Sequence, residues 1–537
     1  MDFQIADLFE GVVAELGDER PALVAGGADP AGRRRFTYRE LDERANRLAH
    51  HLASLGVGEG DRVGCHLFNG NEYGEAMLAA FKLRAVPVNL NYRYVAEELR
   101  YHFEDAEPAV VITEPDLAER VDEARAGTEW PGAVLTRGDE YEAALAASTP
   151  DRVDVGPRSA DDLYLLYTGG TTGRPKGVMW RHEDLFFAAL GGTGAPRQGI
   201  PRLSDPNDVG AWARTGMGID RRLPLSPMMH GLGQWTLLLT VLSGGTCVVS
   251  TDRSFDAGDA LTLIGDERVE LVALIGDALA RPLADELRRH PERYDLSGLR
   301  MITSSGAVLS PAVVADLAEL LPSVKVMNRF GASETANQGR LIDRGDGEGP
   351  RLAADRSNVV LDDDLRPVEP GSGVIGRLAT GGNVPFGYWR DPEKSATTFV
   401  EVDGGRYSVP GDLAMVEEDG SIVVLGRGSM VINSGGEKVF PEEVEAAVKS
   451  HPAVFDAVAV GVPDERFGER VCAVIQLREG AEEPTLDELR DHCRAHIAGY
   501  KAPRELVVAD RVRRTPVGKP DYAWAKDHAA SAVAEAP

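Results

Sequence analysis

Short apolar runs alternate with helix-forming segments between residues 37 and 328, and this alternation is the strongest constraint on the fold. A capping box, Thr37-Tyr38-Arg39-Glu40, predicts the start of a helix whose apolar residues recur at helical spacing as far as Leu55. Strands are predicted at 62–68, 85–89, 109–113, 163–166, 246–250, 271–275, 299–304 and 325–328. Strands that alternate with helices are typical of parallel sheets covered on both faces, so an α/β fold is expected.

The pattern changes from about residue 350 onward. Short β-like runs separated by Gly and Asp turns predict a smaller antiparallel β region packed on the α/β core. Gly426-Arg427-Gly428-Ser429 has the composition of a domain boundary. Beyond it, a helix starting at Pro441, two strands at 457–462 and 471–477, and a helix at 486–497 predict a small α+β domain. The Ala- and Glu-rich C-terminal tail is expected to be frayed.

Composition excludes several classes of protein. The formal net charge of −28 argues against a nucleic-acid-binding surface, which would be basic. The four cysteines are far apart and lack metal-ligand spacing, so free thiols and a cytoplasmic location are expected. No N-terminal secretory signal and no apolar run of transmembrane length is visible, so neither secretion nor a transmembrane segment is expected.

A glycine-rich stretch, Tyr167-Thr168-Gly169-Gly170-Thr171-Thr172-Gly173-Arg174-Pro175-Lys176-Gly177, follows the strand predicted at 163–166. Glycines let backbone N–H groups face a ligand, and such a concave run with hydroxyls and a lysine suits the oxygens of a polyphosphate. It is not a Walker A loop, because that pattern ends in Gly-Lys-Ser/Thr. Alone, the stretch is equally consistent with a glycine-rich surface turn.

The segment 191–222 is rich in Gly, Pro, Asp and Arg, and its length is typical of a lid, an interface or a partly disordered loop. His230 and Trp235 follow it, beside an apolar run at 235–242 that suits an aliphatic or steroidal tail. A histidine with the apolar neighbours Met228 and Met229 has a less favoured alternative as a packed structural residue.

Three more motifs follow in order: Phe330-Gly331-Ala332-Ser333-Glu334-Thr335, Gly411-Asp412-Leu413 and Thr515-Pro516-Val517-Gly518-Lys519. With the glycine-rich stretch, they make the chain resemble the adenylate-forming superfamily of acyl-CoA synthetases, peptide-synthetase adenylation domains and firefly-type luciferases. The resemblance spans about residues 37–519. The runs at 177–181 and 426–433 resemble most closely the bacterial fatty-acyl-CoA synthetases, including those acting on sterol side chains.

The resemblance implies an α/β fold with a large N-terminal domain, residues 1–427, of two α/β sheet subdomains plus a small β region. A small mobile α+β C-terminal domain, residues 428–537, is implied to carry the catalytic lysine. It would rotate about a hinge at Gly428 and Ser429; relatives commonly have Asp or Lys where Ser429 stands. Glycine and serine can absorb such a rotation.

The resemblance also implies the role of each motif residue. Thr168, Thr171, Thr172 and Lys176 would contact the ATP β- and γ-phosphates; Glu334 would hold Mg²⁺; Phe330 would stack on adenine; Asp412 and Arg427 would reach the ribose. Lys519 would act between the substrate carboxylate and the α-phosphate, with Thr335 close by. The full predicted ATP-binding set is Thr168, Gly169, Gly170, Thr171, Thr172, Gly173, Lys176, Gly306, Ala307, Phe330, Gly331, Ala332, Ser333, Asp412 and Arg427.

Segments in the C-terminal part resemble the family's thioester-forming face, which implies CoA contacts for Gly436, Lys438, Lys501 and Arg504. Each charged residue has a plain alternative as an exposed or capping side chain, because charged residues are mostly exposed. The order and spacing of four motifs outweigh those alternatives for Glu334, Asp412 and Lys519. They do not do so for the CoA contacts.

We therefore expect an ATP-, Mg²⁺- and CoA-dependent ligase that converts a hydrophobic carboxylic acid to an acyl-adenylate and then to a thioester. The acid would be a medium- or long-chain fatty acid or a sterol side-chain acid, because no substrate-specifying polar pair is visible. A stand-alone adenylation enzyme that loads a carrier protein remains an alternative, as does a non-catalytic nucleotide- or acyl-binding protein. The resemblance leaves a homodimer open.

Overall fold

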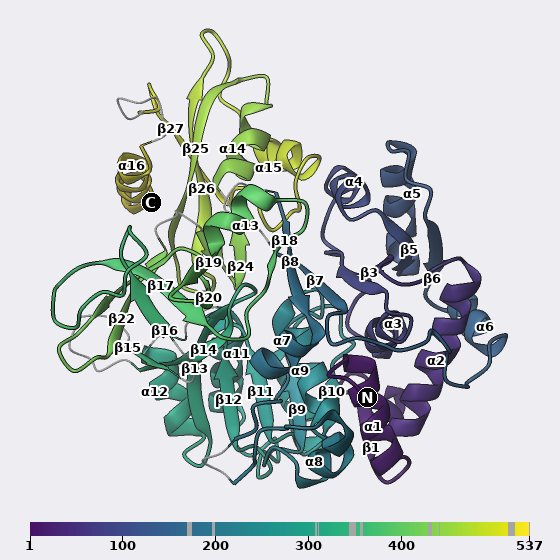
Figure 1. Ribbon diagram of the computed structural model, residues 1–537. Coiled ribbons are helices and arrows are strands. Elements are labelled where there is room, and N and C mark those ends of the chain that lie inside the picture. Colours follow the sequence, from purple (N-terminus) through teal and green to yellow (C-terminus); the bar gives the residue numbers. More distant parts are fainter. Residues whose placement is uncertain are drawn as a thin grey trace.

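The computed structural model describes residues 1–168, 174–195, 199–306, 309, 311–342, 351–354, 358–427, 432–439, 441–513 and 521–535. Figure 1 shows two large sheets in the body of the molecule and a smaller domain, in yellow-green, above them. The predicted α/β fold is confirmed. Among the helices described, none is both long and apolar enough to cross a membrane.

Among the residues that the structure describes, one sheet of the body has seven strands in the order β18-β8-β7-β4-β3-β5-β6. Five of them, from β7 to β6, run parallel, as predicted from the strand–helix alternation. The strands are β3 (Arg62–His66), β4 (Val86–Asn89), β5 (Pro108–Thr113), β6 (Ala133–Thr136), β7 (Leu163–Thr168), β8 (Lys176–Arg181) and β18 (Gly387–Tyr388). Strand β8 pairs with β7 and was not predicted; the helix that follows it begins at His182.

Within the described ranges, the other sheet contains fifteen strands, because the predicted small β region joins it instead of forming a separate layer. The junction is the antiparallel pair β13–β14, which continues the parallel strands β11, β12 and β13. The parallel part comprises β1 (Pro21–Ala25), β9 (Arg221–Pro224), β10 (Thr246–Val249), β11 (Leu271–Leu274), β12 (Met301–Ser304) and β13 (Lys325–Ala332), with β2 (Arg34–Thr37) at its edge. The antiparallel part comprises β14 (Ala336–Ile342), β15 (Arg351–Ala354), β16 (Asn358–Leu361), β17 (Gly376–Gly381), β19 (Phe399–Val402), β20 (Gly405–Ser408), β21 (Asp412–Val416) and β22 (Ile422–Arg427).

The main hydrophobic core lies between these sheets, around α9 (Gly231–Leu242). Leu237 of α9 packs against Gly74 of α3, where an added Cβ would lie 3.3 Å from the leucine Cδ1. The helices of the body are α1 (Ile5–Leu16), α2 (Tyr38–Ser54), α3 (Asn71–Lys82), α4 (Ala96–Asp105), α5 (Ala118–Ala126), α6 (Asp139–Ala146), α7 (His182–Ala189), α8 (Val209–Thr215), α9, α10 (Ala257–Asp266), α11 (Gly276–Arg289), α12 (Pro311–Leu320) and α13 (Pro392–Thr398). Helix α8 falls within the segment 191–222, which is therefore partly helical.

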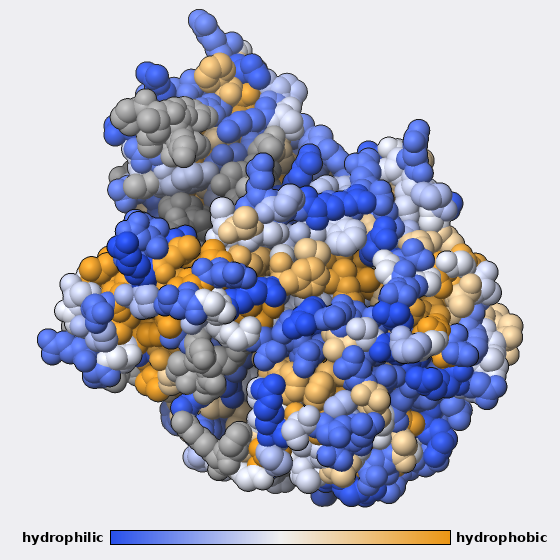
Figure 2. All heavy atoms as spheres, in the orientation of Figure 1, coloured by the Kyte–Doolittle hydropathy of each residue, from blue (hydrophilic) through white to orange (hydrophobic). Residues whose placement is uncertain are grey.

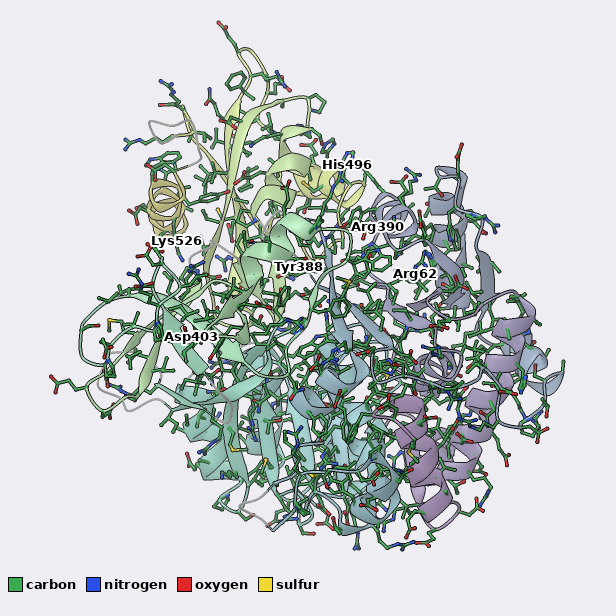
Figure 3. The ribbon with its side chains drawn as sticks, in the orientation of Figure 1. Arg62, Tyr388, Arg390, Asp403, His496 and Lys526 are labelled. Carbon is green, nitrogen blue, oxygen red and sulfur yellow. The ribbon has the colours of Figure 1, made fainter. Side chains whose placement is uncertain are left out.

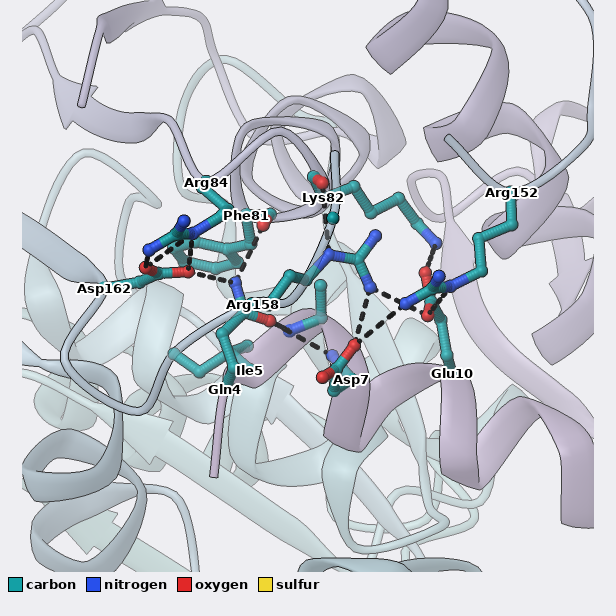
Figure 4. Close-up of polar contacts among 12 residues, drawn as sticks. Gln4, Ile5, Asp7, Glu10, Phe81, Lys82, Arg84, Arg152, Arg158 and Asp162 are labelled. Carbon is teal, nitrogen blue, oxygen red and sulfur yellow. Dashed lines mark hydrogen bonds and ion pairs between the residues drawn. The ribbon is translucent and has the colours of Figure 1, made fainter. Parts of the chain in front are cut away.

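A buried ionic cluster attaches α1 to the seven-stranded half of the body (Figure 4). The Lys82 side chain is inaccessible to solvent, and its ammonium lies 2.8 Å from Glu10 and 2.7 Å from Asp42. Arg158, equally buried, donates to Asp7 at 2.7 Å and to Glu10 at 2.8 Å. Each buried charge thus has an opposite partner, which a buried charge requires.

The smaller domain has its own sheet and two hydrophobic clusters, as expected of an α+β unit. Its elements are β23 (Ile432–Ser434), β24 (Glu437–Val439), α14 (Pro441–Lys449), β25 (Val454–Asp464), β26 (Gly468–Leu477), α15 (Leu486–Arg494), β27 (Glu505–Val508) and α16 (Tyr522–Glu535). The expectation of a frayed tail is wrong: α16 packs on β25 and buries Ala525 and Ala529. Residues 428–431 are outside the described ranges, so the boundary at 427/428 stays a prediction.

The visible surface is mainly hydrophilic, with apolar side chains concentrated below the smaller domain (Figure 2). Part of this apolar surface overlies the β16–β22 region. Val374 and Ile375, in the connection that leads into β17, are exposed apolar side chains.

Candidate active site

A cavity of about 950 Å³ lies where the two domains meet. Its walls come from the end of α7 and the loop after it, from α9, and from strands β11, β12 and β13. The smaller domain closes one side with Gly436, Glu437, Tyr500 and Lys501. A concave site of this size at a domain junction is typical of small-molecule binding.

Five of the predicted ATP-binding residues line this cavity: Thr168, Gly306, Gly331, Ala332 and Ser333. Gly306 follows β12 with φ +84°, a conformation that favours glycine. A Cβ on Gly331 would lie 1.9 Å from the carbonyl oxygen of Ala336, so the β13–β14 pair can close at this point only around glycine. These glycines leave backbone groups facing the cavity without a side chain between.

Three predicted residues of the same motif, Phe330, Glu334 and Thr335, do not line the cavity. Phe330 packs against the hydrophobic cluster of the β region, and its stacking on adenine stays a prediction. Thr335 is completely buried; its hydroxyl accepts a hydrogen bond from the Ala332 N–H at 2.9 Å and lies 3.2 Å from Gln338 Oε1. Thr335 therefore supports the turn after β13, and its place beside the α-phosphate stays a prediction.

Glu334 is held by a residue that the sequence analysis did not single out. Tyr388 Oη donates a hydrogen bond to Glu334 Oε1 at 2.9 Å, and the Lys176 ammonium lies 5.5 Å from the centre of the Tyr388 ring. Lys176 also pairs with Asp391 at 2.6 Å. Burial alone would raise the Asp391 pKa, but Lys176 and other donors outweigh burial and hold the pKa below its usual value. Lys176, the lysine predicted to contact the ATP phosphates, is thus the first residue of β8 and forms an ion pair with Asp391 in this structure.

The residues predicted to bind the ribose are paired with each other on adjacent strands. Asp412, at the start of β21, pairs in register with Arg427, at the end of β22. The Asp412 side chain is buried. Only the backbone of Arg427 is described, and neither residue is among those lining the cavity.

Several predicted residues lie outside the described ranges. They are Gly169, Gly170, Thr171, Thr172, Gly173, Ala307, Gly428, Ser429 and Lys519. Their roles stay predictions.

The turn between β23 and β24 brings the smaller domain to the cavity. Glu437 Oε1 lies 3.2 Å from His230 Nε2 and also pairs with Arg93. Burial would raise the Glu437 pKa, but His230, Arg93 and Lys501 outweigh it and lower the pKa to about 2. Gly436 has φ +84°, and a Cβ there would lie 2.2 Å from Ile275 Cγ2.

A second contact between the domains involves Lys501, which was predicted to meet CoA. Its ammonium lies 2.8 Å from Glu98 of α4 and 5.1 Å from the Tyr94 ring centre. His496, labelled in Figure 3, lies beside the same helix, 3.6 Å from Glu97. Lys501 lines the cavity, whereas Arg504 packs on the Phe467 ring at 4.3 Å outside it. The Lys438 side chain is not described.

The rest of the cavity is mostly apolar and extends beneath α9. His230 and Trp235, the predicted pocket residues, both line it; His230 is the N-cap of α9, and Trp235 lies within that helix. Asn89 fixes the loop before His230: its amide donates to the carbonyl oxygens of Tyr167 at 2.9 Å and Met229 at 2.7 Å. Sequence reasoning missed Asn89, Tyr388 and Glu437, although Glu437 belongs to a segment that it had singled out.

Comparisons with known proteins show to which family the chain is similar. Residues 9–389 match the family described as AMP-binding enzyme, and residues 443–519 match the AMP-binding enzyme C-terminal domain. The chain is 46% identical, over 98% of its length and 96% of the relative, to a 3-oxocholest-4-en-26-oate--CoA ligase of Rhodococcus rhodochrous. It is 44% identical, over 98% of its length and 96% of the relative, to a medium/long-chain-fatty-acid--CoA/3-oxocholest-4-en-26-oate--CoA ligase of Mycolicibacterium smegmatis.

Solved structures are similar to this chain over nearly its whole length, at lower sequence identity. The amide bond synthetase McbA from Marinactinospora thermotolerans superposes with a TM-score of 0.78 at 26% identity, covering 98% of this chain and 99% of that one. A Mycobacterium tuberculosis fatty acyl CoA synthetase superposes with a TM-score of 0.65 at 25% identity, covering 99% of both chains.

Proposed function

The chain belongs to the AMP-binding enzyme family, and from this premise we propose that it is an ATP- and CoA-dependent ligase of hydrophobic carboxylic acids. Its substrates are medium- or long-chain fatty acids or sterol side-chain acids, the classes named for its relatives. One observation carries the proposal: a single cavity connects the glycines of the nucleotide motif, an apolar interior beneath α9, and the C-terminal residues Glu437 and Lys501.

The first step exchanges a poor leaving group for a good one. A substrate carboxylate oxygen attacks the α-phosphorus of ATP and diphosphate leaves, forming the acyl-adenylate. Charge builds on the phosphate oxygens, so positioning and cations supply most of the catalysis. We assign the phosphate end to the glycine-rich stretch at 168–177, and the contact between carboxylate and α-phosphate to Lys519.

Glu334 is the residue that would hold Mg²⁺. Among the described residues there is no cluster of three or more His, Cys, Asp or Glu side chains suited to a metal. A single carboxylate fits Mg²⁺, which commonly binds proteins through one or two carboxylates together with substrate phosphates. The bound ion would neutralise phosphate charge, and the hydrogen bond from Tyr388 orients the Glu334 carboxylate for it.

The second step forms the thioester. The CoA thiol, losing its proton, attacks the acyl carbonyl carbon and AMP leaves with the electron pair of the broken C–O bond. The docked position of Gly436, Glu437 and Lys501 supports assigning this face of the smaller domain to that step. The Glu437–His230 contact would keep the domain docked while the thiol reacts.

A fatty-acid panel tests the proposal. With ATP and Mg²⁺, we expect AMP release that depends on a hydrophobic acid and rises on addition of CoA, with acyl-CoA as product. AMP release unaffected by CoA would favour transfer to a carrier protein, and absence of AMP with every acid would overturn the enzyme assignment.

A Lys519→Ala variant tests the division of roles. We expect it to lose adenylation far more than thioester formation from supplied acyl-adenylate. Equal losses in both steps would contradict the assignment.

A further inference from the structure

The deep end of the cavity carries a buried arginine. Arg222, on β9, lines the cavity and is only 4% exposed. In the sheet it pairs with Leu271 of β11, which pairs in turn with Met301 of β12, and both of these residues also line the cavity. These three side chains therefore form one cross-strand row at the cavity floor.

Arg222 has few protein partners for a buried cation. Its Nη1 donates to Ser243 Oγ at 3.4 Å, while that hydroxyl donates to the Leu239 carbonyl at 2.7 Å. Within the described ranges no carboxylate forms an ion pair with Arg222; the carboxylates of Asp220 and Glu270 favour its charge electrostatically, and Glu270 itself pairs with Arg300 at 3.5 Å. Burial lowers the Arg222 pKa to about 10, so the guanidinium is charged at neutral pH.

The surroundings of Arg222 make this charge notable. Thr236 and Leu239 of α9 and Met217 and Ile219 of the preceding segment line the same cavity. A plain hydrocarbon chain reaching the floor would strip water from the guanidinium and offer nothing in return, and burying an unpaired charge is unfavourable. A carbonyl oxygen at the same place would accept its hydrogen bonds.

The row that contains Arg222 also lies at a defined distance from the predicted nucleotide-binding residues. Met301 lines the cavity in the same row as Arg222. Ser305, four residues later, lines it next to Gly306, one of the predicted ATP-binding residues. Four residues of extended chain span ~13 Å. A substrate that has its carboxylate beside Gly306 and His230 and extends ~13 Å along the sheet therefore has its other end at Arg222.

We propose that Arg222 is a specificity-determining residue that donates hydrogen bonds to a carbonyl oxygen at the end of the acyl substrate farthest from its carboxylate. This inference rests on the proposed ligase function and narrows it to distally oxygenated hydrophobic acids. It explains why a pocket with apolar walls retains a cation at its floor.

A matched pair of acids tests the proposal without any variant. Dodecanoate and its oxo derivative at the penultimate carbon have nearly the same shape and differ in the distal carbonyl. We expect wild-type kcat/KM to favour the oxo acid by about 10- to 100-fold, the range for a hydrogen bond to a charged group. Equal kcat/KM for the two acids would overturn the proposal.

Arg222→Met then removes the donor while keeping an unbranched side chain. We expect it to abolish the preference by lowering kcat/KM for the oxo acid, with dodecanoate turnover retained. Arg221→Met is the matched control, because Arg221 precedes it on β9 outside the cavity and donates instead to the Glu267 carbonyl at 2.9 Å. An equal loss for both acids in Arg222→Met would assign Arg222 a purely structural role.

Arg222→Lys covers the case in which the methionine variant does not fold. It keeps the charge but loses the planar donor fork, so a partial loss restricted to the oxo acid is expected. A complete lack of AMP formation by the wild type with every acid would instead refute the ligase function, a result distinct from failure of the Arg222 proposal.

Discussion

Glu437 Oε1 lies 3.2 Å from His230 Nε2, and this contact joins the smaller domain to the N-cap of α9 at the wall of the cavity. The carboxylate is shared with Arg93, so two donors from the body hold one acceptor from the C-terminal part. The contact combines residues 207 positions apart in the chain. It defines the docked arrangement that we assign to thioester formation.

Replacing Glu437 with glutamine tests that arrangement. Glu437→Gln keeps the shape of the side chain but removes its charge, and truncating one partner of a buried charged pair commonly costs 2–5 kcal/mol. We expect thioester formation from supplied acyl-adenylate to fall at least ~10-fold. Adenylation, measured as diphosphate release without CoA, should remain near wild type. Glu465→Gln, an exposed site in the same domain, is the control, and equal loss of both half-reactions would contradict the assignment.

Gly436→Ala blocks the same docking by steric means. Its Cβ would lie 2.2 Å from Ile275 Cγ2, and the residue has φ +84°. We expect loss of thioester formation with adenylation retained, and partial recovery when Ile275→Ala is added. Gly480→Ala is the control for backbone strain. Gly480 also has a positive φ, +77°, but an added Cβ there would have no atom within 4 Å and so would not collide with a neighbour. Similar losses in the two glycine variants would attribute the effect to strain alone.

Tyr388→Phe removes the hydroxyl that orients Glu334. Loss of such an outer contact typically weakens metal binding by 10- to 100-fold. We therefore expect adenylation to need about 10-fold more Mg²⁺ for half-maximal rate, with thioester formation from supplied acyl-adenylate unchanged. Tyr294→Phe breaks a similar Tyr–Glu hydrogen bond, to Glu286, away from the cavity and should leave the Mg²⁺ requirement unchanged. If Tyr388→Phe needs the same Mg²⁺ concentration as the wild type for half-maximal adenylation, the assignment of Glu334 as the Mg²⁺ ligand would be contradicted.

The order of strands and helices was predictable because their periodicity is local. The capping box at Thr37 and the apolar strands at 62–66 and 271–274 appear in the structure nearly where predicted. Strand β8 was missed because its residues follow a glycine-rich stretch, and only pairing with β7 makes them a strand. The helical tail was missed because its stability comes from packing Ala525 and Ala529 on a sheet formed much earlier in the chain.

Motif residues were predictable as a set, but their individual positions were not. Gly331 lines the cavity as expected, whereas Thr335, four residues later, directs its hydroxyl into a turn. Arg222 gave no signal in the sequence, since a charged residue at the start of a short strand usually faces solvent. Its importance depends on a cross-strand row and on a cavity that only the folded chain creates.

The ionic cluster around Glu10 makes the stability of the body depend on pH. Burial alone would raise the Glu10 pKa, but Lys82, Arg158 and Arg152 outweigh burial and lower it from 4.5 to about 2. Because the folded pKa is depressed, the stabilisation is fully present above pH ~4.5 and is lost as pH falls toward 2. The shift corresponds to about 3 kcal/mol of unfolding free energy.

Glu10→Gln should therefore unfold more easily than the wild type at neutral pH, by about 3 kcal/mol, and the difference should shrink as pH falls from 4.5 toward 2. Urea unfolding of the full chain at several pH values, followed by tryptophan fluorescence, measures this. Glu119→Gln, at an exposed position in α5, should parallel the wild type throughout. A constant difference between Glu10→Gln and the wild type at every pH would mean that the glutamate contributes packing and hydrogen bonds only. A difference that closes in acid would show that its charge, held against Lys82 and Arg158, fixes α1 to the body.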